Sequence, residues 1–156
     1  MSDLAAAEPA SFSDAEILAR FQRSQNLPTG SQTLGFRLTA VNQAERSVEV
    51  AFEAKAELVL NPMKQVQGGY LCAMLDEAMS VACMVASGMT HVAPTAEMKT
   101  SFLRPALPGP LKAIGRVVKW GRTIAFTEGE LFDGEGRLVA KASGTAVPTP
   151  FRNYKK

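Results

Sequence analysis

Two carboxylates interrupt an otherwise uncharged part of the chain. Asp76 and Glu77 are the only side chains of the Asp, Glu, Lys and Arg types between Lys64 and Glu97. Residues 67–87 around them are mostly apolar and are good helix formers, which is typical of a buried helix. A carboxylate in such a helix costs free energy unless it is paired or used in chemistry. This anomaly is the main functional clue in the sequence.

A glycine pair opens the same predicted helix. A helix N-terminus offers unpaired backbone N–H groups at the positive end of its dipole, and Gly68 and Gly69 would let a carbonyl approach that backbone closely. This is the arrangement of an oxyanion hole for acyl transfer. Eight residues separate Gly68 from Asp76, which is about 12 Å along a helix axis. At this distance, the Gly68 N–H and the Asp76 carboxylate of one chain cannot act on the same carbonyl. A site of this kind would therefore combine Gly68 of one chain with Asp76 of the other across a two-fold dimer.

Helical spacing distinguishes the two acids. Asp76 falls on a stripe of small residues with Ala73, Ser80 and Cys83, where another molecule could approach closely. A structural hydrogen bond would explain Asp76 equally well on the helix pattern alone. Glu77 lies one position further round, where its longer side chain reaches water more easily. An ordinary charge at the edge of the helix is therefore the simpler interpretation of Glu77.

The composition is that of an ordinary globular domain, with 46% hydrophobic and 21% charged residues in a chain of 156. We expect a loose N-terminal tail over residues 1–12, one domain over 13–150 and a short C-terminal tail over 151–156. The N-terminus lacks the basic flank and apolar core of a secretory signal. Polar residues within 78–96 argue against a membrane span.

The cysteines, the single histidine and the charges limit the chemistry. Cys72 and Cys83 lie eleven residues apart on one predicted helix, about 16 Å, which excludes a disulfide and fits a reducing cytoplasm. One histidine, His91, and these two cysteines do not make a zinc site, so neither a metal nor another cofactor is predicted. No G-x-S-x-G motif is present, and a serine triad would have to recruit His91, which we interpret as an ordinary loop residue.

The net charge of +2 hides an asymmetry. Residues 1–97 carry 6 Lys and Arg against 11 Asp and Glu, a net charge of −5, and residues 98–156 carry 11 against 4, a net charge of +7. A basic half could bind a phosphorylated ligand or nucleic acid. Its charges are spaced singly along predicted strands rather than clustered with aromatic residues, which argues against nucleic acid.

The remaining patterns predict the elements that would position these residues. Ser13 and Glu16 form a capping-box pattern for a short helix that ends near Ser24. Alternating apolar residues and turn residues predict strands over 33–41, 47–57, 90–103, 111–120, 123–132 and 137–147. Alternate small residues in the last strand would let a helix lie close to it. The order predicts an α+β fold in which one antiparallel sheet wraps around one long apolar helix.

Three stretches resemble the hotdog-fold acyl-CoA thioesterases of the PaaI-like group over about residues 34–147. They are N-P-M-K-Q-V-Q-G-G-Y-L-C-A-M-L-D from Asn61, T-A-E-M-K-T-S-F-L-R-P-A from Thr95 and K-W-G-R-T-I-A-F from Lys119. The resemblance implies a hotdog fold that forms homodimers, often paired again into tetramers. It also implies a cytoplasmic enzyme that hydrolyses an acyl-CoA thioester without a metal or cofactor.

The resemblance also implies roles for individual residues. Asn61 and the Gly68 backbone N–H would hold and polarise the thioester carbonyl, and Asp76 of the other subunit would be nucleophile or general base. Thr95 falls where the family often has a hydroxyl that orients the attacking water. Gln67 stands where the family usually has histidine; its amide can still donate a hydrogen bond, but it cannot ionise.

The resemblance also implies which residues would contact the substrate. Gly69 would lie beside the substrate, and Arg104, Lys119 and Arg122 are candidates for the coenzyme A phosphates, although solvated strand ends explain these three charges equally simply. Two alternatives remain at this stage. A non-catalytic acyl-CoA binding module would use the same groove, and a hotdog dehydratase would need His91 in its site. A DNA-binding regulator has less support, because residues 1–30 supply only one helix.

Overall fold

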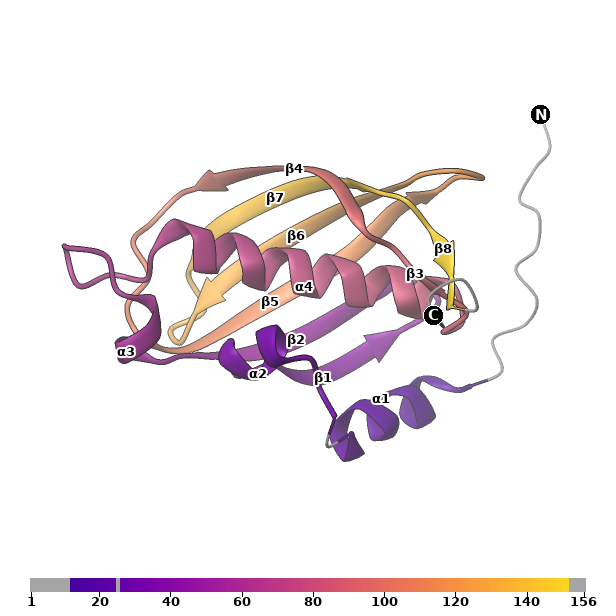
Figure 1. The fold of residues 1–156 in the computed structure, drawn as a ribbon, viewed down its shortest axis with the longest axis horizontal. Coiled ribbons are helices and arrows are strands. Elements are labelled where there is room, and N and C mark those ends of the chain that lie inside the picture. The colour runs from indigo at the N-terminus through magenta and orange to yellow at the C-terminus, as the bar shows by residue number, and fades with distance from the viewer. Residues whose placement is uncertain (1–11, 25, 152–156) are drawn as a thin grey trace.

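One long helix lies across a six-stranded antiparallel sheet in the computed structural model, which describes residues 12–24 and 26–151. The sheet order is β1-β2-β5-β6-β7-β4, and β3 pairs with β8 in a separate two-stranded sheet (Figure 1). The helices are α1 (Asp14–Arg23), α2 (Thr29–Thr33), α3 (Ala56–Val59) and α4 (Gly68–Ala86). The strands are β1 (Arg37–Asn42), β2 (Ser47–Ala54), β3 (His91–Val92), β4 (Thr95–Phe102), β5 (Gly109–Trp120), β6 (Ala125–Asp133), β7 (Leu138–Ala146) and β8 (Thr149–Pro150). The α+β hotdog arrangement predicted from the sequence is confirmed, whereas the two predicted tails lie almost wholly outside the described residues.

Local signals set both ends of α4. The side chain of Gln67 caps the N-terminus by accepting a hydrogen bond from the Gly69 N–H. At the other end Gly88 has a φ of 64°, its N–H donates to the Val85 carbonyl, and the Met89 N–H donates to the Met84 carbonyl. This pair of bonds is a Schellman motif, which requires a left-handed residue and therefore favours glycine. The predicted helix and its stop at Gly88 are confirmed.

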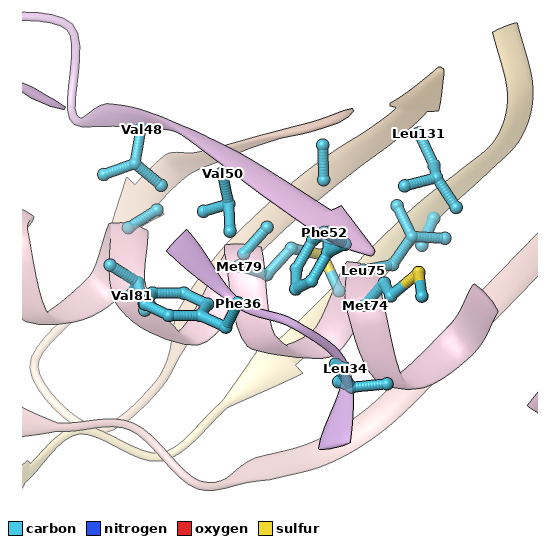
Figure 2. Packing of buried hydrophobic residues seen from close by; sticks show 14 of the residues in the cluster. Leu34, Phe36, Val48, Val50, Phe52, Met74, Leu75, Met79, Val81 and Leu131 are labelled. Atoms are coloured by element: carbon cyan, nitrogen blue, oxygen red, sulfur yellow. The ribbon is translucent and has the colours of Figure 1, made fainter. Parts of the chain in front are cut away.

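The concave face of the sheet buries α4. Figure 2 shows Val50 and Phe52 of β2 directed at Leu75 and Met79 of the helix, and all four side chains are buried. By length and composition α4 could cross a membrane, but half of it is buried inside the fold. Its apolar character is therefore that of a core helix.

The helix approaches the sheet closely at a glycine. A Cβ on Gly115 of β5 would lie 2.3 Å from the carbonyl oxygen of Ala78, and Gly115 pairs with Gly129 on β6. The small-residue face of β7 predicted from the sequence also lies under the helix, with Ala140 and Ala142 buried. Among the glycines of the sheet, the one that lies closest to the helix is nevertheless on β5, where the sequence pattern did not indicate it.

Replacing Gly115 by alanine is expected to lower the free energy of unfolding by about 3 kcal/mol, because helix backbone, which cannot rotate away, occupies the space of the new methyl group. Gly30 in α2 is the matched control, since a Cβ there would meet nothing within 4 Å. Gly30→Ala should change the stability by less than about 0.5 kcal/mol. Urea denaturation followed by circular dichroism measures both changes, and equal stability of the two variants would contradict this account of the packing.

Three predicted strand boundaries are wrong. The strand predicted over 33–41 begins only at Arg37, because Thr29–Thr33 form α2 and Gly35, with a φ of 64°, turns the chain. The strand predicted over 47–57 ends at Ala54. Its apparent continuation is the short helix α3, since the small alanines in its alternating pattern are equally good helix formers.

The strand predicted over 90–103 is divided into β3 and β4 at Ala93 and Pro94. Proline has no N–H to donate to a strand ladder, so the pairing is interrupted there. The short helix predicted from Ser13 to Ser24 is confirmed as α1, including both hydrogen bonds of the capping box between Ser13 and Glu16.

Candidate active site

Asp76 lies in the middle of α4 and forms a hydrogen bond with the first residue of β4. The Thr95 hydroxyl donates to the Asp76 carboxylate over 2.5 Å; Thr95 is exposed and Asp76 is half-buried. A hydrogen bond to an ionised carboxylate is stronger than one between neutral groups, so Thr95 holds the carboxylate in one orientation. The structural hydrogen bond left open by the sequence is therefore present, and the carboxylate still faces solvent.

The helix is less enclosed than its composition suggests. Gly69 and Ala73 are exposed and Ser80 is half-buried, so the small-residue stripe is open from Ala73 to Ser80, around Asp76, and closes only at the buried Cys83. The sequence predicted a buried helix, and α4 is buried over only part of its surface. The sheet covers the opposite face, and β4 reaches this one at Asp76.

Glu77 has a structural role. The hydroxyl of Ser31, which is only 2% exposed, donates to Glu77 over 2.6 Å and ties α2 to α4. The interpretation of Glu77 as an ordinary edge charge is wrong. A buried hydroxyl needs a partner, and the residue that supplies one lies 46 positions away in the chain.

The N-terminus of α4 presents one free donor. The Gly69 N–H is taken by the Gln67 side-chain oxygen over 2.6 Å, and a Cβ on Gly69 would lie 2.7 Å from that oxygen. Gly69 therefore makes room for the cap formed by Gln67. Among the described residues, the Gly68 N–H meets no acceptor. The amide nitrogen of Gln67 remains able to donate, because only its oxygen is used by the cap.

Asn61 shapes the loop that leads into this helix. Its side-chain oxygen accepts from the Met63 N–H at 2.9 Å and from the Gln65 N–H at 3.1 Å, while its backbone N–H donates to the Gln65 carbonyl. The oxygen is therefore used within the loop. Within the described part of the chain, the amide nitrogen of Asn61 has no acceptor and could serve a ligand.

Three contacts join α4 to the edge strand β4. A Cβ on Gly68 would lie 3.1 Å from the Phe102 ring, the Cys72 thiol donates to the Thr100 hydroxyl over 3.4 Å, and Asp76 accepts from Thr95. Gly68 and Asp76 stand at the two ends of this series on one continuous helix, about 12 Å apart along its axis. One chain thus brings Thr95 to Asp76 but leaves Gly68 and Asp76 apart.

The candidate phosphate-binding cations also lie apart. Arg104 follows Phe102, which is in register with Ala140 of β7. Lys119 and Arg122 flank the other end of the sheet, where Trp120 aligns through Ala125 and Ala146 with Thr95. The Arg104 guanidinium donates to the Leu138 carbonyl over 2.8 Å. None of the three cations forms an ion pair with a described residue, whereas Lys112, Arg116, Arg137 and Lys141 all do.

Comparisons with known proteins decide the family. Residues 64–140 match the family described as the thioesterase superfamily. The chain is 34% identical to a provisionally named thioesterase related to phenylacetic acid degradation from Ralstonia eutropha JMP134, whose solved structure has a TM-score of 0.73 and aligns over 83% of this chain and 98% of that chain. This chain belongs to the thioesterase superfamily.

Further relatives agree with this family. A protein of Thermoplasma volcanium provisionally named as an esterase is 28% identical over 113 residues, which are 72% of this chain and 82% of that protein. The PaaI protein of Escherichia coli, at 23% identity and a TM-score of 0.70 over 78% of this chain and 85% of that one, shares the fold. A Streptococcus mutans protein bound to acetyl-CoA also shares the fold, at 24% identity and a TM-score of 0.63 over 74% and 89%. The protein is a PaaI-like thioesterase with the hotdog fold, as the sequence motifs predicted.

The lone histidine of this thioesterase contacts Thr90 and Trp120. The His91 Nδ1 lies 2.8 Å from the Thr90 hydroxyl, and its ring meets Trp120 edge to face at 6.0 Å between centroids. Neither contact involves Asp76 or the N-terminus of α4. Within one chain, these contacts do not bring His91 to the site that a dehydratase would need.

The two cysteines of the thioesterase differ in accessibility. Both are free; Cys83 is buried and Cys72 is half-buried beside β4. Burial raises the pKa of the Cys83 thiol to about 12, because a thiolate is poorly solvated in the core. We expect an alkylating reagent at pH 8 to modify Cys72 well before Cys83, because the thiolate is the reacting form.

Mass spectrometry of the alkylated protein with and without urea tests this difference. One label should appear in the folded protein and two in the unfolded protein, with the second on Cys83. Equal rates of labelling at both positions in the folded protein would contradict the burial of Cys83.

Proposed function

We propose that this thioesterase hydrolyses an acyl-CoA thioester to the free acid and coenzyme A, without a metal or cofactor. The observation that supports this most directly is the accessible Asp76 carboxylate held by the Thr95 hydroxyl on an open face of α4. An oriented carboxylate next to solvent can remove a proton from water as a general base. It can also attack a carbonyl directly as a nucleophile.

The substrate carbonyl would bind at the N-terminus of α4. The free Gly68 N–H, with the amide nitrogens of Asn61 and Gln67, would donate to the carbonyl oxygen and stabilise the negative charge that develops there. Asp76 of the partner subunit would take a proton from water as the water oxygen bonds to the carbonyl carbon. The carbon–sulfur bond then breaks, and the proton passes to the leaving thiolate.

The sheet edge supports a shared site of this kind. β4 is an outermost strand, and its outer edge pairs with no described strand. In an antiparallel pair of two β4 strands with Phe102 opposite Thr95 of the partner subunit, the Gly68 end of one α4 would lie beside the Asp76 region of the other. The two-fold axis would then pass between Met98 and Lys99. We propose this homodimer, which could pair again into a tetramer.

The same symmetry would bring separated cations together. Arg104 of one chain would approach the sheet end that carries Lys119 and Arg122 of the other, so one coenzyme A could use cations from both chains. The acetyl-CoA bound to the Streptococcus mutans protein of this fold supports this class of ligand. The free thiols of Cys72 and Cys83 support a cytoplasmic location.

A panel of aryl-, short- and long-chain acyl-CoAs tests the proposal. With at least one of these acyl-CoAs, the purified protein should cause the absorbance of the thioester bond to fall and should release coenzyme A. Tight binding of acyl-CoA with no turnover of any member would instead indicate a binding module and would contradict the proposed hydrolysis.

A further inference from the structure

A cavity lies between helix α1 and the edge of the sheet. The helix packs against β1, the outermost strand on the side opposite β4 (Figure 1), and the side chain of Ile17 that anchors it is completely buried. The cavity has a volume of about 260 Å³ and lies at the C-terminal end of α1. We call it the α1–β1 cavity. Four apolar and three polar residues line it: Phe21, Leu27, Phe36 and Leu38, and Gln22, Ser24 and Arg37.

The fold holds the apolar wall of this cavity in place. The Phe21 ring of α1 packs on the Phe36 ring at 6.2 Å between centroids, and Phe36 packs edge to face on Phe52 of β2 at 6.1 Å. The side-chain amide of Gln32 donates to the Leu27 carbonyl over 2.7 Å and fixes the loop after α1. A wall supported in this way is formed before a ligand arrives, so little conformational entropy is lost on binding.

The cavity is separate from the candidate active site. Four strands lie between β1 and β4, so the two edges of the sheet are about 24 Å apart along the sheet, at about 4.8 Å per strand. The proposed homodimer pairs two β4 strands and leaves β1 at its outer edges. A ligand of the α1–β1 cavity would therefore not compete with a thioester for Gly68, Asn61 or Asp76.

The polar residues of the cavity all offer hydrogen-bond donors. Arg37 has a guanidinium, Gln22 a side-chain amide and Ser24 a hydroxyl, and no acid is among the described residues that line the cavity. Arg37 also forms no ion pair with a described residue. A carboxylate accepts hydrogen bonds from a guanidinium in a well-matched geometry, whereas an ammonium group would be repelled by it. The donors therefore match a carboxylate head group.

The volume limits the apolar part of the ligand. A cavity of about 150 Å³ lined by leucine, isoleucine and phenylalanine holds one benzene molecule. The α1–β1 cavity, at about 260 Å³, has room for one ring with a short chain, but not for coenzyme A or a long acyl chain.

We propose that the α1–β1 cavity is a binding site for small apolar monocarboxylates, such as an aryl group on a short alkanoate chain. The apolar body lies against Phe21, Leu27 and Phe36, and the carboxylate accepts from Arg37. This site goes beyond the proposed function, because it requires neither a thioester nor Asp76. Carboxylic acids are also the products of the proposed hydrolysis, so the test has to distinguish this cavity from the active site.

Three probes with the same carbon skeleton test the ligand class. Titration calorimetry of the purified protein should show that 3-phenylpropanoate binds at least about tenfold more tightly than 3-phenylpropan-1-ol, because hydrogen bonds between charged groups are the stronger ones. The cation 3-phenylpropylamine should bind more weakly than the alcohol. Equal affinities for the acid and the alcohol, or no saturable binding of the acid, would overturn the proposed class.

Nuclear magnetic resonance locates the bound acid. Nuclear Overhauser effects from the ring protons of 3-phenylpropanoate should reach the methyl groups of Leu27 and Leu38, which line the cavity. Effects only to Ala73 and Met84, which are accessible on α4 near Asp76, would place the acid in the candidate active site and overturn the proposed site.

Matched arginine variants test the head group. Arg37→Gln keeps a donor but removes the charge, so the affinity for 3-phenylpropanoate should fall about tenfold while that for the alcohol stays within about twofold. Arg23→Gln is the control, because Arg23 is exposed on the last turn of α1 but does not line the cavity. Its affinities should stay within about twofold of the wild type. Equal losses in the two variants, or no loss in Arg37→Gln, would overturn the role of Arg37.

Filling the cavity tests the apolar wall. Leu27→Trp should abolish binding of both the acid and the alcohol, because the larger ring takes up the space of the ligand. Circular dichroism checks that this variant is folded, and if it is not, the resonance contacts and the arginine variants still decide. Undiminished binding to folded Leu27→Trp would overturn the site. None of these measurements depends on hydrolysis, so the acyl-CoA panel tests the proposed function separately.

Discussion

Replacement of Asp76 by asparagine is expected to lower kcat by about 10²–10⁴-fold, the usual contribution of a positioned general base. Asparagine has nearly the same shape, and its side-chain oxygen can still accept the Thr95 hydrogen bond. It cannot take a proton from water or act as the nucleophile. Binding of acyl-CoA, measured by calorimetry, should stay within a few-fold of the wild-type value.

The neighbouring acid supplies the control. Glu77→Gln keeps an oxygen that can accept from Ser31, and the proposed chemistry does not use Glu77. Its kcat should stay close to that of the wild type. A variant Asp76→Asn that hydrolyses thioesters at the wild-type rate would contradict the role given to Asp76, whatever the outcome at Glu77.

Mixing two inactive variants is expected to restore activity if the site is shared. Asn61→Asp keeps the oxygen that the loop needs but removes the amide donor, and Asp76→Asn removes the base. Each homodimer then lacks one part of both sites. A mixed dimer has one intact site, which combines Asn61 from the Asp76→Asn chain with Asp76 from the Asn61→Asp chain.

Random exchange of subunits makes half of the dimers mixed, and each mixed dimer has one working site of two. The recovered activity should therefore approach about a quarter of the wild-type value, by the symmetry of a two-fold interface. Native mass spectrometry establishes that exchange has occurred. If exchange is complete and no activity returns, the proposed division of the site between two chains is wrong.

The sequence by itself determined the features that depend on near neighbours in the chain. The extent of α4 follows from its composition and from Gly88, and α1 follows from the capping box of Ser13 and Glu16. The distance between Gly68 and Asp76 depends only on the rise of an α-helix, so the sequence sufficed to show that one chain cannot bring them together. The family motifs at Asn61, Thr95 and Lys119 are also short continuous stretches, so they can be identified without the structure.

Strand boundaries in the first third of the chain were less predictable. Small residues such as Ala54 and Ala56 fit a strand pattern and a helix equally well, so the pattern alone could not separate β2 from α3. Strand pairing in the fold separates the two elements. Ala54 pairs with Gly109, the first residue of β5, whereas Ala56 lies beyond that pairing.

Only the tertiary structure decided which distant groups meet. Thr95 donates to Asp76 across 19 positions and Ser31 donates to Glu77 across 46 positions. The packing of α4 on the sheet places Gly115 of β5 against the backbone of Ala78. The physical reason is that periodicity assigns a residue to a face of its own element, whereas its partner depends on which strands pair and in what register. The exposed face of α4 lies beside β4 because β4 is the outermost strand of the sheet. The order of strands in a sheet cannot be predicted from a local sequence pattern.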